Sequence, residues 1–92
     1  MEPYRIILAD DHVLIRQGLK RILERASGFE IIGEAIDGFG LLRLLSKITP
    51  NLVLLDISMP NLRGLEAIRE IKAIHSTVKA LMLTKSVQTS LR

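Results

Sequence analysis

Short apolar runs alternate along this chain with segments whose apolar residues recur every three to four positions. The apolar runs cover residues 4–9, 29–35, 52–55 and 78–83. Short, continuous runs rich in Ile, Leu and Val are typical of strands buried on both faces. The segments between them carry the spacing of amphipathic helices. The order β-α-β-α-β-α-β predicts an α/β fold in which right-handed crossovers build a parallel sheet with helices on both sides.

The helical segments have recognisable apolar stripes and ends. From His12 to Ala26 the stripe comprises Leu14, Ile15, Gly18, Leu19, Ile22, Leu23 and Ala26. The second helix is marked by Leu41, Leu42, Leu45 and Ile48, and the third by Leu65, Ile68 and Ile71. Ser27-Gly28 should end the first helix, with Gly28 in the left-handed conformation. Asp37 is a plausible N-cap of the second helix, and Thr49-Pro50 should stop it.

Composition excludes several classes of protein. Ninety-two residues make at most one small domain, and 48% hydrophobic residues supply its core. The chain has no cysteine, so disulfides, thiolate metal sites and thiol catalysis are excluded. The net charge of +3 comes from basic residues that are spread along the chain, so charge alone does not indicate a DNA-binding protein. No signal peptide or membrane span is visible, which predicts a soluble, cytoplasmic chain without membrane contact.

Polar residues that suit phosphoryl chemistry follow the apolar runs. Asp10-Asp11 ends the first predicted strand, Asp56 the third and Thr84 the fourth. Because ligands of open parallel sheets bind at the carboxyl ends of the strands, we expect these groups to converge. Clustered carboxylates repel unless a cation lies between them, and hard oxygen ligands suit Mg²⁺. A carboxylate can also act as the nucleophile that forms an aspartyl phosphate. The competing interpretation is structural, with single aspartates forming turns and Asp11 capping the first helix.

Three stretches of the sequence resemble the receiver domain of bacterial response regulators. They are residues 8–12 (Leu-Ala-Asp-Asp-His), residues 53–64 (Val-Leu-Leu-Asp-Ile-Ser-Met-Pro-Asn-Leu-Arg-Gly) and residues 81–84 (Leu-Met-Leu-Thr). Residues 10–19 most resemble the subgroup that carries a helix-turn-helix of the LuxR and NarL type. The resemblance extends from about Tyr4 to Thr84. It implies a flavodoxin-like, doubly wound sheet with strand order 2-1-3-4.

The resemblance also implies a role for each matching residue. Asp56 would accept a phosphoryl group from a sensor histidine kinase or a small phosphodonor, and Thr84 would be the switch hydroxyl. Asp11 would bind Mg²⁺ directly and Asp10 largely through water, with the backbone carbonyl of Ser58 as a further ligand. The domain would be a regulatory module that catalyses only its own phosphorylation and dephosphorylation. Control of transcription would act through a DNA-binding helix-turn-helix domain that is absent from this chain.

The sequence also departs from the family pattern. A complete receiver domain has a fifth strand, two further helices and a lysine after that strand, whereas eight residues follow Thr84 here. Residues 1–84 are therefore expected to be an incomplete receiver domain, and residues 85–92 a polar tail that could begin a fourth helix or be disordered. Without a fifth strand the fourth becomes an exposed edge, which favours self-association. The alternative function is accordingly a non-signalling interaction or dimerisation fragment.

Four further residues invite interpretation. His12 is expected to be a partly exposed residue of the first helical turn rather than a metal ligand or proton carrier. His75 is expected to interact favourably with the C-terminal end of the third helix. Met82 should belong to the core, and Lys85 should be an exposed lysine.

A metal-dependent phosphatase is a weaker hypothesis, because such enzymes need a second acid shortly after the nucleophile.

Overall fold

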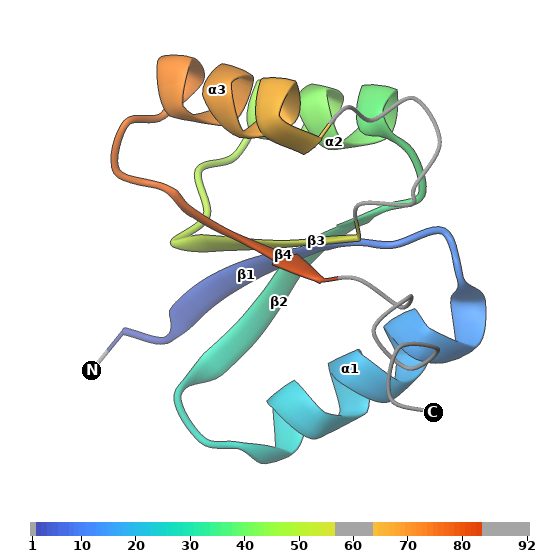
Figure 1. Ribbon diagram of the computed structural model, residues 1–92. Coiled ribbons are helices and arrows are strands. Elements are labelled where there is room, and N and C mark those ends of the chain that lie inside the picture. The colour runs from blue at the N-terminus through green and yellow to red at the C-terminus, as the bar shows by residue number, and fades with distance from the viewer. Residues whose placement is uncertain (1, 57–63, 84–92) are drawn as a thin grey trace, which may run out of the picture.

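Four parallel strands form the centre of the molecule, with helices on both faces of the sheet (Figure 1). The computed structural model describes residues 2–56 and 64–83. The elements are β1 (Tyr4–Ala9), α1 (Val13–Arg25), β2 (Phe29–Ala35), α2 (Gly38–Leu45), β3 (Leu52–Asp56), α3 (Gly64–Ile74) and β4 (Lys79–Leu83). The strand order is β2-β1-β3-β4, and every neighbouring pair is parallel. The predicted fold class and strand order are therefore confirmed.

The alternation of side chains along the central strands explains their continuous apolar sequence. Ile7, Ala9, Val53 and Leu55 belong to a cluster that also contains residues of α2 and α3. Figure 1 shows these two helices on the same face of the sheet. The rest of this main core cluster consists of Ala35, Leu41, Leu45, Ile71 and Val78. Ile6, Leu8 and Leu54 form a smaller cluster on the other face, against which Leu19, Leu23, Ile31 and Leu52 pack. Both faces of β1 and β3 are thus buried, as the sequence predicts.

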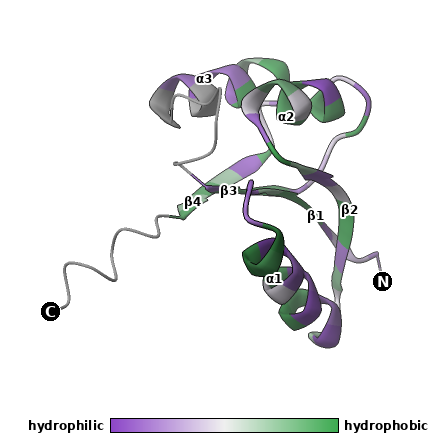
Figure 2. Cartoon of the chain, turned by 90° about the vertical axis from the view of Figure 1, so that its right-hand side faces the viewer, coloured by the Kyte–Doolittle hydropathy of each residue, from purple (hydrophilic) through white to green (hydrophobic). Residues whose placement is uncertain are grey.

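Helix α1 packs more loosely than its apolar stripe predicts. Leu19 and Leu23 contact the smaller cluster, but no residue of this helix is fully buried. Leu14 and Ile22 are 86% and 66% exposed. Figure 2, in which α1 lies apart from α2 and α3, shows hydrophobic residues along the helix. Only part of the expected stripe is in contact with the sheet, because the cluster beneath α1 has just three buried side chains in the described part of the chain.

The predicted ends of the helices are mostly confirmed. Gly28 has a φ of 95°, the left-handed conformation that favours glycine, in the turn that leads into β2. The carboxylate of Asp37 accepts a hydrogen bond of 2.7 Å from the backbone N–H of Gly40 and so caps α2. This helix ends at Leu45, earlier than the Thr49-Pro50 stop predicts. Ile48 nevertheless packs against the main core from beyond the helix.

His75 has a more specific role than the predicted interaction with a helix end. Its Nε2 lies 2.7 Å from the carbonyl oxygen of Leu45. A carbonyl oxygen only accepts, so this ring nitrogen carries the hydrogen and donates it. The bond joins the end of α3 to the last turn of α2. Met82, the predicted core residue of β4, is partly buried and packs against the main cluster. None of the helices in the described residues is long and apolar enough to cross a membrane.

Candidate functional site

The register between the two central strands brings two of the predicted acids together. Ala9 of β1 pairs with Leu55 of β3, so the residue that follows each of them is an aspartate at the carboxyl end of the sheet. Asp10 is 3% exposed and Asp56 is 1% exposed. Buried carboxylates need compensating partners. Two neighbouring buried acids at a strand edge therefore indicate a functional site rather than two turn-forming residues.

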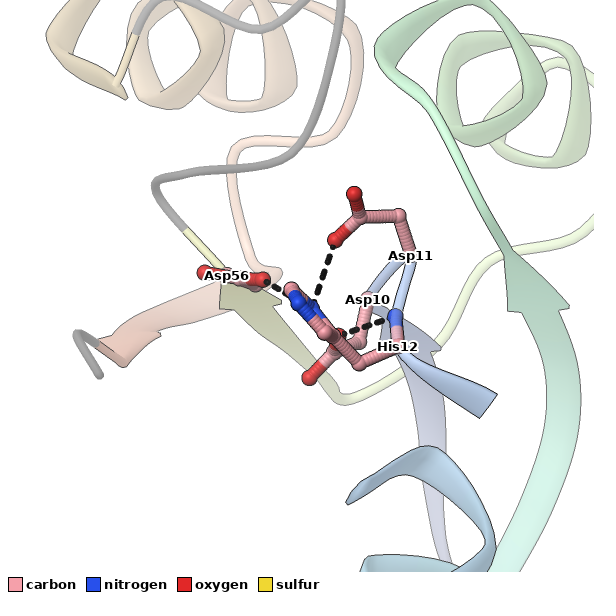
Figure 3. Close-up of side chains that lie close together, drawn as sticks. All are labelled: Asp10, Asp11, His12 and Asp56. Carbon is pink, nitrogen blue, oxygen red and sulfur yellow. Dashed lines mark hydrogen bonds and ion pairs between the residues drawn. The ribbon is translucent and has the colours of Figure 1, made fainter. Parts of the chain in front are cut away.

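Asp11 and His12 complete a compact cluster with these two acids (Figure 3). One potential ligand atom from each of the four residues lies within 4.8 Å of the others. The Nδ1 atom of His12 is 3.0 Å from Asp11 Oδ1, 3.5 Å from Asp10 Oδ1 and 3.8 Å from Asp56 Oδ2. The three acids thus converge as expected, and the imidazole joins them. His12 is partly exposed, as predicted, but its ring faces the acids, which the sequence interpretation did not anticipate.

The start of α1 holds the first acid in place. The backbone N–H of His12 donates a hydrogen bond of 2.8 Å to Asp10 Oδ1, and Arg16 Nη1 donates one of 2.8 Å to the carbonyl oxygen of Asp10. Arg16 was not among the predicted site residues. The competing interpretation placed Asp11 as the cap of the first helix, but the N-cap residue of α1 is His12, whose side chain makes no capping hydrogen bond. Asp11 consequently has its carboxylate in the cluster instead.

Arg16 also connects the site to the neighbouring strand. Its Nε lies 2.8 Å from Glu34 Oε1, and Lys20 Nζ lies 3.0 Å from Glu34 Oε2. Burial acts to raise the pKa of Glu34, but hydrogen bonds from Lys20 and Arg16 and the attraction of their charges outweigh it. The pKa of this carboxyl therefore lies below its ordinary value. Arg16 and Lys20 lie one helical turn apart on α1, and this spacing is the only sequence signal for their shared ion pairs with Glu34.

The remaining predicted site residues lie outside the described residues. They are Ser58, expected to bind the metal through its carbonyl, and Thr84, expected to be the switch hydroxyl. Lys85 lies outside them as well. Their roles stay predictions. The residues that the structure does bring together have the donor set of a divalent metal site, with three carboxylates at the edge of a sheet. Hard oxygen ligands of this kind fit Mg²⁺.

Comparison with known proteins agrees with the fold. The family described as response regulator receiver domain matches residues 6–92. The transcriptional regulatory protein YdfI of Bacillus subtilis is 39% identical over 80 residues, which are 87% of this chain and 38% of YdfI. Response regulator UvrY of Escherichia coli is 40% identical over 86 residues, which are 94% of this chain and 39% of UvrY. The chain thus spans less than half the length of either relative.

Solved structures show the same likeness. RcsB, a response regulator of Salmonella typhimurium, has a TM-score of 0.83 and 29% identity, covering 91% of this chain and 44% of RcsB. The receiver domain of the putative response regulator NarL from Mycobacterium tuberculosis has a TM-score of 0.82 and 29% identity, covering 91% of this chain and 68% of that domain. The chain belongs to the response-regulator receiver family. It is a regulatory module of the kind found in two-component signalling.

Proposed function

We propose that this chain accepts a phosphoryl group on Asp56 from the phosphohistidine of a sensor histidine kinase. The observation that carries the proposal is the position of Asp56, which is buried at the end of β3 with Asp10 and Asp11 beside it. An oxygen of its carboxylate would attack phosphorus, so that an O–P bond forms while the N–P bond of the donor breaks. The cytoplasmic location expected from the sequence is part of this proposal.

The neighbouring acids would hold Mg²⁺, which supplies neutralisation of the negative charge on the phosphoryl group. Asp11 is the more accessible carboxylate, with 30% of its side chain exposed, and suits direct binding. The carboxylate of Asp10 accepts a hydrogen bond from the backbone N–H of His12, and its backbone carbonyl accepts one from Arg16. This support fixes the carboxylate before any ion arrives. The carbonyl of Ser58 and the hydroxyl of Thr84 complete the proposed set.

Acetyl phosphate provides a direct test. The chain is incubated with acetyl phosphate and Mg²⁺, and intact-mass spectrometry should detect the addition of one phosphoryl group. Asp56→Asn should abolish the addition, and a chelator should prevent it in the wild type. Asp37→Asn is the matched control, since it makes the same chemical change at a helix cap that is not part of the cluster. Modification that persists in Asp56→Asn would refute the assignment of the acceptor.

A second candidate function is self-association through β4. Among the described residues, this strand pairs with β3 only, and Leu81 on it is 53% exposed. An unpaired strand edge with an exposed leucine favours pairing with another chain. Light scattering coupled to size-exclusion chromatography should then show a dimer that Leu81→Lys shifts toward monomer. A monomer at all concentrations would exclude this function. Transcriptional control is also part of the proposal, because YdfI is named a transcriptional regulatory protein and the RcsB structure is described for its DNA interaction.

A further inference from the structure

The imidazole of His12 lies in the acidic cluster, although the proposed phosphoryl transfer assigns it no role. Its Nδ1 atom faces the three carboxylates of the acidic cluster (Figure 3). The distances are 3.0 Å to Asp11, 3.5 Å to Asp10 and 3.8 Å to Asp56. Each of the three acids thus has an oxygen close to this one nitrogen. The donor set of the pocket is therefore mixed nitrogen and oxygen.

These distances match the spacing of ligands around one small metal ion. Nitrogen and oxygen ligands lie about 2.0–2.2 Å from a divalent transition metal such as Zn²⁺. Two such ligands at octahedral or tetrahedral angles are then about 2.8–3.6 Å apart. The separations of Nδ1 from Asp11 and Asp10, 3.0 Å and 3.5 Å, both fall in this range. The third, to Asp56, is slightly longer. The His12 side chain is 54% exposed, so a rotation that shortens this distance meets few neighbouring atoms on the solvent side.

We propose that His12 is a nitrogen ligand of this site, which therefore binds a divalent transition metal ion of the Zn²⁺ or Co²⁺ type through mixed coordination. The proposal rests on the proposed acidic metal site and extends it. Carboxylate and carbonyl oxygens suit Mg²⁺, whereas imidazole suits Zn²⁺, Ni²⁺ and Cu²⁺. A site with only the three acids would bind through oxygen alone. The imidazole gives this chain a means to select a different ion at the same carboxylates.

Nuclear magnetic resonance of the histidine side chains tests this directly, because the chain has only two histidines. The full chain is labelled with ¹⁵N and titrated with Zn²⁺ and, separately, with Mg²⁺. Zn²⁺ should shift the Nδ1 resonance of His12 strongly and leave His75 unchanged, since the Nε2 of His75 donates to a backbone carbonyl. Mg²⁺ should not shift the Nδ1 resonance in this way. A Nδ1 resonance that responds to neither ion would overturn the proposal.

Calorimetry on variants supplies an independent measurement. His12→Phe removes the donor but keeps a planar ring, and His12→Asn keeps a polar group without the imidazole. Each should lower Zn²⁺ affinity by about tenfold or more, the range seen when groups supporting a metal site are lost. Mg²⁺ affinity should stay nearly unchanged. His75→Gln is the matched control and should keep the wild-type Zn²⁺ affinity. Circular dichroism establishes that each variant is folded.

The outcomes separate this inference from the proposed function. Equal Zn²⁺ affinity in wild type and both His12 variants would overturn the nitrogen ligand, while phosphorylation of Asp56 could still occur. Zn²⁺ binding that survives Asp56→Asn at full strength would place the ion elsewhere and also overturn the proposal. Failure of Asp56 modification with Mg²⁺ and acetyl phosphate concerns the proposed function alone.

Discussion

Asp56→Asn should make the metal-free protein more stable, although it removes the proposed functional group. The ligand atoms of the acidic cluster all lie within 4.8 Å of one another. Two unit charges 4.8 Å apart repel by about 3.5 kcal/mol at an effective dielectric constant of about 20. Solvent reaches Asp11, and the His12 ring lies among the acids, so part of this repulsion is already offset. We therefore expect the free energy of unfolding to rise by about 1–2 kcal/mol.

Mg²⁺ should reverse the order of stability. An ion that binds only the folded state adds about 2.7 kcal/mol when its free concentration is 100 times its dissociation constant. The wild type should gain this amount, because three carboxylates then surround the ion. The Asp56→Asn variant should gain much less, because one of the three has become neutral. Higher metal-free stability of Asp56→Asn together with its smaller gain from Mg²⁺ would show that the acids form a metal site. Acids without a metal-binding role would not show the second effect.

Urea unfolding followed by circular dichroism measures both effects. Each protein is unfolded in a chelator and again in saturating Mg²⁺. Asp37→Asn is the control for a general effect of charge, since Asn caps a helix about as well as Asp and should change stability little. A metal-free Asp56→Asn variant that is less stable than the wild type, or one that gains as much from Mg²⁺, would refute the reasoning.

Three other perturbations test the fold and the support of the site. Asp37→Ala should lower the free energy of unfolding by about 1 kcal/mol, as measured in urea, because the helix cap is lost. Leu55→Ala should cost about 3 kcal/mol in the same assay, because Leu55 is fully buried in the main core. The depressed pKa of Glu34 means that its ion pairs with Arg16 and Lys20 stabilise the fold above the ordinary pKa of the carboxyl. That contribution is lost as the pH falls through the lower folded-state value, so Glu34→Gln should flatten the acid side of the profile of stability against pH.

The Leu55→Ala and Glu34→Gln measurements each have an outcome that would contradict the reasoning behind them. Leu14→Ala, at a side chain that is 86% exposed, is the matched control for the core variant and should change stability little. Equal losses for Leu14→Ala and Leu55→Ala would mean that the core is not where the structure places it. An unchanged acid profile in Glu34→Gln would show that its ion pairs contribute nothing to folding.

The sequence predicted the order of the elements because each strand and helix has its own local pattern. Strand β2 runs from Phe29 to Ala35 as predicted, and β3 extends the predicted run 52–55 by one residue. The Asp37 cap and the left-handed Gly28 were also predictable, since both depend on residues close in the chain. The boundaries were less certain where side chains pack from outside an element. Ile48 illustrates this, because it extends the apolar stripe of α2 although the helix has already ended.

The meeting of Asp10 and Asp56 follows from sequence, because each ends an apolar strand and the two strands are neighbours in the receiver order. Only the tertiary structure decided what surrounds them. The His12 ring faces the acids, and Arg16 contacts both Asp10 and Glu34. Both contacts depend on the orientation of α1 relative to the sheet, which no local pattern specifies. The same holds for the weak burial of α1 itself. Its amphipathic spacing is visible in the sequence, but how much of that stripe is buried depends on which residues the sheet places beneath it.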